Sequence, residues 1–177
     1  MLRSDMSNVD TPPMPDAIRR IADSTDRQLA WQFFVFFARF EYALKRCTKY
    51  LKRSVEPNWD RFSSDHDVEF RRHASAALTS AIEYFKKFPP QKQQQVDGQL
   101  TWSAPKGYDE RDPLLVWLLI AVRGVRNNLF HGGKFPGFPV SDPSRDRDLI
   151  GNAIVILDAC LKLDTQVRGK FLAGIED

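Results

Sequence analysis

The sequence predicts an all-α protein, an up-and-down bundle of four main helices with additional short helices. Four long segments carry apolar residues at spacings of three and four, which is the periodicity of a helix with one buried face. No segment of any length alternates between apolar and polar residues as a half-buried strand does. Hydrophobic residues make up 42% of the 177-residue chain, which is enough for the core of one such bundle.

The N-terminal residues set the expected domain boundary. Residues 1–14 are polar, contain prolines and show no periodicity, so we expect a mobile leader there. Residues 15–177 are then expected to form a single helical domain. A short helix is expected over Pro15–Asp23, because Ile18 and Ile21 would share one of its faces.

The first long helix is expected over about Asp26–Lys52. Thr25 is followed three residues later by Gln28, which is the spacing of a capping box. The apolar stripe of this helix consists of Phe33, Phe36, Phe37, Phe40, Leu44, Cys47 and Leu51. Because such a broad aromatic stripe needs more than one packing partner, we expect it to form the core of the bundle.

The second long helix is expected over about Asp65–Phe88, with Phe70, Leu78 and Phe85 on one face. The pair Pro89-Pro90 ends it, because proline removes a helical donor and restricts the preceding residue.

A long loop and a third helix are expected next. The segment Gln91–Asp109 is polar and rich in turn-forming residues, so we interpret it as a loop. Asp112 as N-cap and Pro113 at the first helical position then begin a helix that continues to about Phe130. Gly132-Gly133 provides a strong signal for its end.

The last long helix is expected to begin at Ser141–Pro143, where the serine and aspartate side chains can cap it. Its apolar stripe consists of Ile150, Ala153, Ile154, Leu157, Cys160 and Leu161. Cys47 and Cys160 lie far apart within apolar helical stripes, so we expect both to be buried, reduced thiols.

The charge of the chain permits an anionic partner such as RNA without requiring one. The formal net charge is +3, and the segment Pro113–Val140 contains no acidic residue. No charged segment followed by an apolar one opens the chain, and the longest apolar runs are too short to span a bilayer. We therefore expect a cytoplasmic protein without membrane partners.

The third helix changes character along its length. Its N-terminal half is almost wholly apolar, whereas its C-terminal part carries Arg126, Asn127, Asn128 and His131. Burying these groups without partners would be costly. We therefore expect them to line a cleft or an interface.

This segment resembles the signature of the HEPN superfamily, in which an arginine is followed by a spacer of four to six residues and a histidine. Arg126 and His131 match that signature with a four-residue spacer, and Asn127 matches the polar residue that commonly follows the arginine. The layout of helices over residues 26–167 is also similar. The resemblance implies a helical bundle that cleaves RNA by attack of the ribose 2′-hydroxyl on the adjacent phosphate, without a metal or other cofactor.

The residue types suit this chemistry. Histidine titrates near neutral pH, so His131 can exchange protons with the ribose or leaving oxygen. The planar donors of Arg126 fit phosphate oxygens. Asn127 can orient His131 or donate to phosphate. Candidate contacts to the RNA backbone are Asn128, Lys134 and Arg123.

Geometry and the resemblance together favour a homodimer. Five helical residues advance about 500°, so Arg126 and His131 would point about 140° apart on one ideal helix. Either the helix unwinds before Gly132, or two motif helices face each other across a two-fold axis. The resemblance implies the second arrangement. A toxin or phage-defence role would add a neutralising antitoxin protein as a partner.

Other readings of these residues stay open. Arginine and histidine near a helix C-terminus also favour the helix dipole. The alternative function is a non-catalytic helical module that binds RNA, a nucleotide or a partner protein. Glu41 could support the site by reaching Arg126, or it could pair with Lys45 in the same helix.

A metal site is not expected. Asp65, His66 and Asp67, with His73 one heptad further on, contain ligand-type side chains. Capping at the start of the second long helix explains the two aspartates better.

Overall fold

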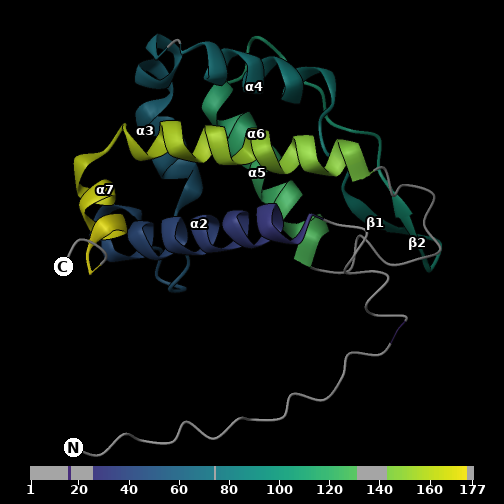
Figure 1. Ribbon diagram of the computed structural model, residues 1–177, viewed down its shortest axis with the longest axis horizontal. Coiled ribbons are helices and arrows are strands. Elements are labelled where there is room, and N and C mark those ends of the chain that lie inside the picture. The colour runs from purple at the N-terminus through teal and green to yellow at the C-terminus, as the bar shows by residue number, and fades with distance from the viewer. Residues whose placement is uncertain (1–15, 17–25, 74, 131–142, 175–177) are drawn as a thin grey trace, which may run out of the picture.

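The computed structural model describes residues 16, 26–73, 75–130 and 143–174. This part of the chain is mostly helical and carries one small two-stranded sheet (Figure 1). The prediction of a mainly α-helical protein is therefore confirmed. The predicted leader over residues 1–14 and nearly all of the short helix predicted over Pro15–Asp23 lie outside the described residues.

Helix α2 (Arg27–Arg46) supplies the aromatic part of the core. Asp26 is its N-cap and accepts a hydrogen bond from the backbone N–H of Leu29 at 3.0 Å. Of the predicted stripe, Phe33, Phe37, Phe40, Leu44 and Cys47 are buried. Phe36 is partly buried, and Leu51 is 40% exposed because it lies beyond the end of the helix, so its predicted place in the core was wrong. The helix ends at Arg46, before the predicted Lys52, and the short 3₁₀-helix η1 (Thr48–Tyr50) follows.

The second long helix is two helices, α3 (Trp59–Arg72) and α4 (Ala76–Lys87), so the prediction of one continuous helix was wrong. The Ser75 side chain accepts a hydrogen bond from the N–H of Leu78 at 3.1 Å and caps α4. Serine prefers this capping geometry to a helix interior. The apolar spacing nevertheless continues across the break, because Phe70 and Leu78 are both buried.

A β-hairpin occupies part of the predicted loop, which corrects that expectation. Strand β1 (Gln93–Val96) pairs antiparallel with β2 (Gln99–Trp102). The turn residues Asp97 and Gly98 have φ angles of 51° and 78°. An Asp-Gly pair adopts positive φ at low cost and matches the twist of a two-residue hairpin.

Helix α5 (Leu114–Phe130) is the central element, and most of its N-terminal half is buried. Asp112 was predicted to cap it. Instead, the N–H of Leu115 donates to Asp67 Oδ1 of α3 at 2.7 Å. Arg71 donates to Asp67 Oδ2 at 2.8 Å and to the Asp112 carbonyl at 3.1 Å, which ties the start of α5 to α3.

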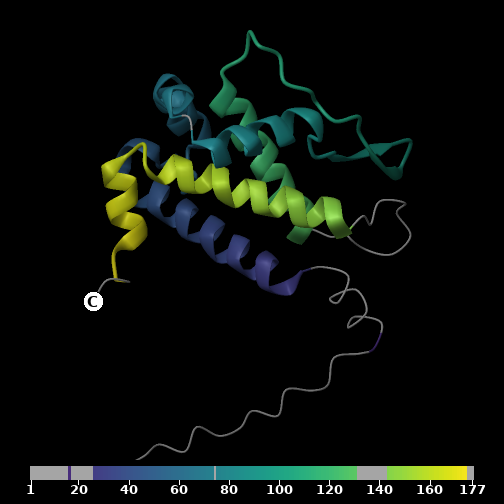
Figure 2. The same cartoon turned by 45° about the horizontal axis from the view of Figure 1, so that its top comes forward.

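Helices α2 and α6 (Pro143–Leu161) lie side by side and run in the same direction, while α5 crosses them (Figures 1 and 2). Arg147 near the start of α6 donates to Asp26 Oδ2 at 3.0 Å, so the two helices begin at the same end of the molecule. Because these neighbours are parallel, the predicted up-and-down arrangement is not confirmed.

The unpredicted helix α7 (Thr165–Leu172) packs against α2. Its N-cap, Asp164, accepts hydrogen bonds from the N–H groups of Gln166 and Val167 at 2.9 and 3.0 Å. The buried Tyr50 hydroxyl donates to the other carboxylate oxygen at 3.1 Å. His66 Nε2 lies 3.0 Å from that hydroxyl and 3.4 Å from the same carboxylate oxygen.

Replacement of Asp164 by Asn should remove the pH dependence that this carboxylate gives to folding. Burial alone would raise the pKa of Asp164, but the N–H of Val167, the Tyr50 hydroxyl and the N–H of Gln166 outweigh it and lower the pKa. A carboxylate with a lowered pKa in the folded state stabilises the fold above its unfolded pKa, about 4. That stabilisation is lost as the pH falls through the folded pKa.

We expect Asp164→Asn to lower the free energy of unfolding by about 1–3 kcal/mol at pH 7, measured by urea denaturation. The difference between the two proteins should shrink when the titration is repeated well below pH 4. If the difference in unfolding free energy stays the same in acid, Asp164 does not have a lowered pKa in the folded protein.

Candidate functional site

The polar residues of the predicted site lie in the C-terminal part of α5, where the helix leaves the core. Arg123, Arg126, Asn127 and Asn128 are described, and the helix reaches Phe130. His131 and Lys134 lie outside the described residues, as does the predicted Gly132-Gly133 stop. The predicted pairing of Arg126 with His131 stays a prediction.

Arg126 is half-buried and lies against α2. Its guanidinium carbon is 5.8 Å from the centroid of the buried Phe37 ring, within the range of a cation–π contact. Its Nη1 donates to Asn127 Oδ1 at 3.1 Å. The aromatic core of α2 thus supports one face of the guanidinium.

A polar hollow of about 250 Å³ opens beside this guanidinium, and we call it the Arg126 hollow. Its described lining residues are Phe37, Glu41, Lys52, Glu56, Pro57, Trp59, Arg123, Arg126 and Asn127. Three cations and two carboxylates therefore surround it. Guanidinium groups at such an edge can donate to an anionic group such as phosphate.

The structure brings Glu41 and Arg126 to the same hollow, although they lie on different helices. The Glu41 carboxylate accepts a hydrogen bond from Trp59 Nε1 at 3.4 Å. Trp59 in turn stacks on Phe40, with ring centroids 5.4 Å apart. This contact holds Glu41 at the hollow, and its predicted support of Arg126 stays a prediction.

The three residues predicted to contact the RNA backbone do not lie together in the described structure. Arg123 lines the Arg126 hollow and lies 3.7 Å from Asp60 Oδ1. Asn128 points to the other side of α5, where its Nδ2 donates to the Gln91 carbonyl at 2.8 Å. Asn128 therefore has a structural partner in the segment before the hairpin, and Lys134 is outside the described residues.

A larger groove runs along α5 on the side of the hairpin, and we call it the α5 groove. Its volume is about 580 Å³. Its described lining comes from three places: residues 89–92 before β1, residues 103–113 after β2, and one face of α5 between Val116 and Asn128. Arg123 and Asn127 line both this groove and the Arg126 hollow, so the two spaces are neighbours.

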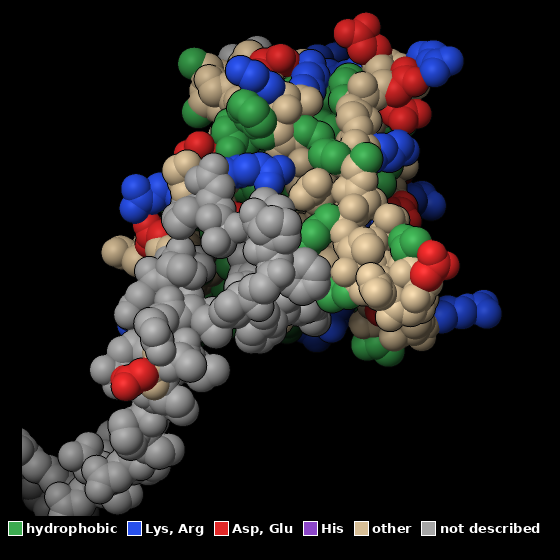
Figure 3. Space-filling view, turned by 90° about the vertical axis from the view of Figure 1, so that its right-hand side faces the viewer, with side chains coloured by type: hydrophobic (Ala, Val, Ile, Leu, Met, Phe, Trp, Pro, Cys, Tyr) green, Lys and Arg blue, Asp and Glu red, His purple; other side chains and the backbone are tan. Residues whose placement is uncertain are grey.

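Figure 3 shows the end of the molecule that carries the hairpin, where hydrophobic side chains lie among lysine and arginine side chains. The sequence did not predict Lys52 and Glu56 at the hollow, or Lys92 and Lys106 at the groove. No local pattern marks these four residues, because tertiary packing alone brings them to α5.

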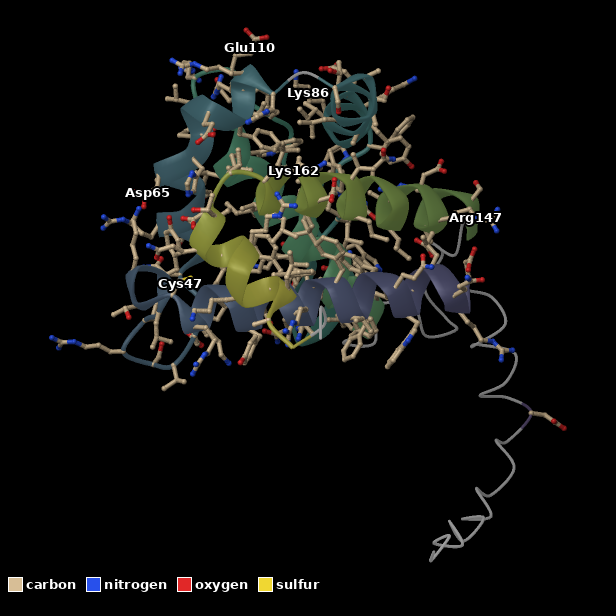
Figure 4. The ribbon with its side chains drawn as sticks, turned by 60° about the vertical axis from the view of Figure 1, so that its left-hand side comes forward. Cys47, Asp65, Lys86, Glu110, Arg147 and Lys162 are labelled. Atoms are coloured by element: carbon tan, nitrogen blue, oxygen red, sulfur yellow. The ribbon has the colours of Figure 1, made fainter. Side chains whose placement is uncertain are left out.

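The described cysteines are buried and free, which confirms that prediction. Burial raises the pKa of both the Cys47 and the Cys160 thiols, so both are protonated and unsuited to nucleophilic attack at neutral pH. Figure 4 shows Cys47 at the end of α2, beside α7.

Asp65, His66 and Asp67 lie inside α3 rather than at a helix start, so the predicted capping of their own helix was wrong. Asp65 pairs with Lys49 at 2.8 Å, and Asp67 caps α5 from outside. Within the described ranges, no cluster of three or more His, Cys, Asp or Glu side chains is arranged to hold a metal ion.

Comparisons of the chain with protein-family models, with curated proteins and with solved structures find no match. No helix in the described part of the chain is long and apolar enough to cross a membrane.

We expect Arg126→Gln to leave the fold intact. The guanidinium is half-buried and rests on one aromatic face, a contact that contributes about 0.5–1 kcal/mol. Urea denaturation should give an unfolding free energy within about 1 kcal/mol of the unmodified protein. A loss of several kcal/mol would mean that Arg126 is chiefly a structural residue.

Proposed function

We propose that this protein is a metal-independent endoribonuclease of the HEPN type that acts as a toxin or phage-defence effector. The observation that carries the proposal is the position of Arg126. Its guanidinium lies at the edge of a polar hollow beside Asn127, five residues before His131 in the sequence. The hollow suits the binding of a phosphodiester, and the proton-transfer group would be supplied by the proposed dimer.

The proposed reaction needs only the RNA and side chains of the protein. His131 accepts the proton of the ribose 2′-hydroxyl, whose oxygen attacks the adjacent phosphorus. The bond from phosphorus to the 5′-oxygen breaks, and the protonated His131 gives its proton to that oxygen, which returns the imidazole to its neutral form. The products are a 2′,3′-cyclic phosphate and a free 5′-hydroxyl. Arg126 stabilises the charge on the phosphorane, and Asn127 orients His131 or donates to phosphate.

The active species is proposed to be a homodimer. On one ideal helix Arg126 and His131 would diverge by about 140°, whereas two motif helices facing each other could combine the arginine of one chain with the histidine of the other. Arg123 and Lys134 would contact the RNA backbone, whereas the Asn128 amide is already bonded to the Gln91 carbonyl on the other side of α5. Cellular RNA as substrate implies a cytoplasmic location, and a toxin role implies a neutralising antitoxin protein.

Cleavage of a mixed RNA substrate in the presence of a chelator tests the proposal. We expect His131→Ala to reduce the rate by about 10²–10⁴-fold, the usual contribution of a general acid or base. Arg126→Gln should reduce it by about 10²–10³-fold through loss of charge stabilisation. His73→Ala is the matched control, because His73 is an exposed histidine elsewhere on the surface, at the end of α3.

Equal cleavage by the unmodified protein and the His131→Ala variant, or none by either, would refute the catalytic proposal. A substrate with 2′-deoxyribose at every position should resist cleavage, because it lacks the attacking hydroxyl.

The second candidate function is a non-catalytic module, and the adjacent α5 groove favours it because a binding module needs an accessible concave surface. Affinity for an uncleavable 2′-deoxy oligonucleotide, measured by fluorescence anisotropy, distinguishes a nucleic-acid ligand from a protein partner. If phosphate contacts dominate, affinity should fall steeply with salt and survive His131→Ala. A flat salt response would instead favour a protein partner.

A further inference from the structure

The floor of the α5 groove is an apolar helix face that the core does not cover. Val116, Ile120 and Gly124 follow one another at intervals of four residues, so they lie on one side of α5. Ile120 is 54% exposed, although most of its apolar neighbours in α5 are buried. A large exposed aliphatic side chain on a concave surface is typical of a binding site.

Residues 89–92, which precede the hairpin, form one wall of the groove, and several contacts fix this wall to the helices. The Pro89 carbonyl accepts from Arg145 Nη2 of α6 at 3.2 Å, and the Gln91 carbonyl accepts from Asn128 at 2.8 Å. Pro90 packs on α5 at Gly124, where a Cβ built on the glycine would lie in ordinary contact distance, 3.4 Å, from Pro90 Cγ. This side of the groove is therefore preformed.

Residues 103–113, which follow the hairpin, form the other wall, and hydrogen bonds hold it in place as well. The N–H of Ser103 donates to the Lys92 carbonyl at 2.8 Å, which joins the two walls at the base of the hairpin. Trp117 Nε1 of α5 donates to the Lys106 carbonyl at 3.2 Å. A groove held at both walls can bind a partner without a large ordering cost.

Positive charge surrounds the apolar floor. Lys92, Lys106 and Arg123 line the groove, and Asp112 is the single acidic side chain among its described lining residues. Lys92 and Lys106 are exposed, so their ammonium groups remain available to a ligand. The charge complementarity therefore favours an acidic partner.

We infer that the α5 groove binds an acidic, amphipathic segment of a partner protein. Residues 114–128 of α5 span about 21 Å, which matches about four turns of a helix laid along the groove. Its apolar residues would cover Ile120, and its carboxylates would meet the lysines and Arg123. Because Asn127 lines both spaces, the bound segment would lie beside Arg126. This inference does not depend on RNA cleavage.

The groove fits a protein segment better than single-stranded RNA. Sequence-tolerant RNA sites present exposed aromatic faces on which bases stack. Trp117, the aromatic side chain among the described lining residues of the α5 portion, is only 5% exposed. The accessible floor is aliphatic, which suits leucine-type side chains.

Two display libraries of 16-residue amphipathic peptides test this inference. Both place apolar residues at helical spacing, and the charged positions are glutamate in one library and lysine in the other. We expect the glutamate library to yield binders. Ile120→Glu should weaken them by ~30-fold or more, the loss typical of a central contact residue. Val68→Glu is the matched control, because Val68 is a 63% exposed aliphatic residue on α3 and should change binding little.

Charge reversal and thiol labelling test the binding of peptides to the α5 groove in two further ways. The double variant Lys92→Glu, Lys106→Glu should weaken the glutamate peptides and strengthen the lysine peptides. In Ile120→Cys, a bound glutamate peptide should slow alkylation of the new thiol, whereas the buried Cys47 and Cys160 should react slowly throughout. This labelling measurement remains informative if Ile120→Glu fails to fold.

Three outcomes would overturn the inference. The first is a glutamate library that yields no more binders than the lysine library. Its binders could retain full affinity for Ile120→Glu and leave Ile120→Cys unprotected. Lastly, a single-stranded RNA oligonucleotide, rather than the peptides, could protect Ile120→Cys, which would assign the groove to nucleic acid. RNA cleavage is measured separately, so failure of one proposal does not decide the other.

Discussion

The N-terminal half of α5 carries large apolar side chains on nearly every side, so it is stable only where other helices enclose it. The remaining architecture follows from this requirement. α3 and α6 pack against it, and Asp67 of α3 accepts the N–H of Leu115 so that the buried helix start keeps a hydrogen-bond partner. Arg71 balances the charge of Asp67 and reaches the Asp112 carbonyl. A helix of this kind has a position fixed by packing, which is the property that a functional site needs from its scaffold.

The same helix explains why the hollow and the groove are neighbours. Where α5 leaves the core, its polar residues diverge around the helix: Arg126 turns toward Phe37 of α2, and Asn128 turns toward Gln91 beside the hairpin. Asn127 lies between them and borders both spaces. A ligand in either space therefore lies within reach of the other. The proposed phosphate site at Arg126 and the proposed protein-binding groove along α5 are therefore neighbours on one helix.

The sequence predicted the elements whose signal is local and missed those that depend on competition or on distant partners. Apolar stripes predicted α2 and α6, because each buries a continuous face, and the Asp112-Pro113 start signal with the apolar run after it predicted α5. Ser75 was overlooked as a cap because the apolar spacing continues across it, and Asp97-Gly98 was overlooked because strands of four residues give little periodicity. At the candidate site, the sequence singled out Arg123, Arg126 and Asn127 of the hollow and suggested Glu41. Lys52 and Glu56 could not be predicted, because only the packing of residues 51–57 near α5 brings them there.

The parallel packing of α2 against α6 has a consequence for how the chain folds during its synthesis. Three hydrogen bonds join residues that are far apart in the sequence. Arg147 donates to Asp26, 121 residues away, Tyr50 donates to Asp164, 114 residues away, and Arg39 donates to the Phe171 carbonyl, 132 residues away. On the ribosome, α3 can pack on Phe37 and Phe40 early, but the part of α2 that packs on α6 and α7 stays uncovered until residues 143–172 have been synthesised. Such long-range closure slows folding relative to a bundle of consecutive hairpins. During that interval the aromatic face is the surface most exposed to chaperones and to self-association.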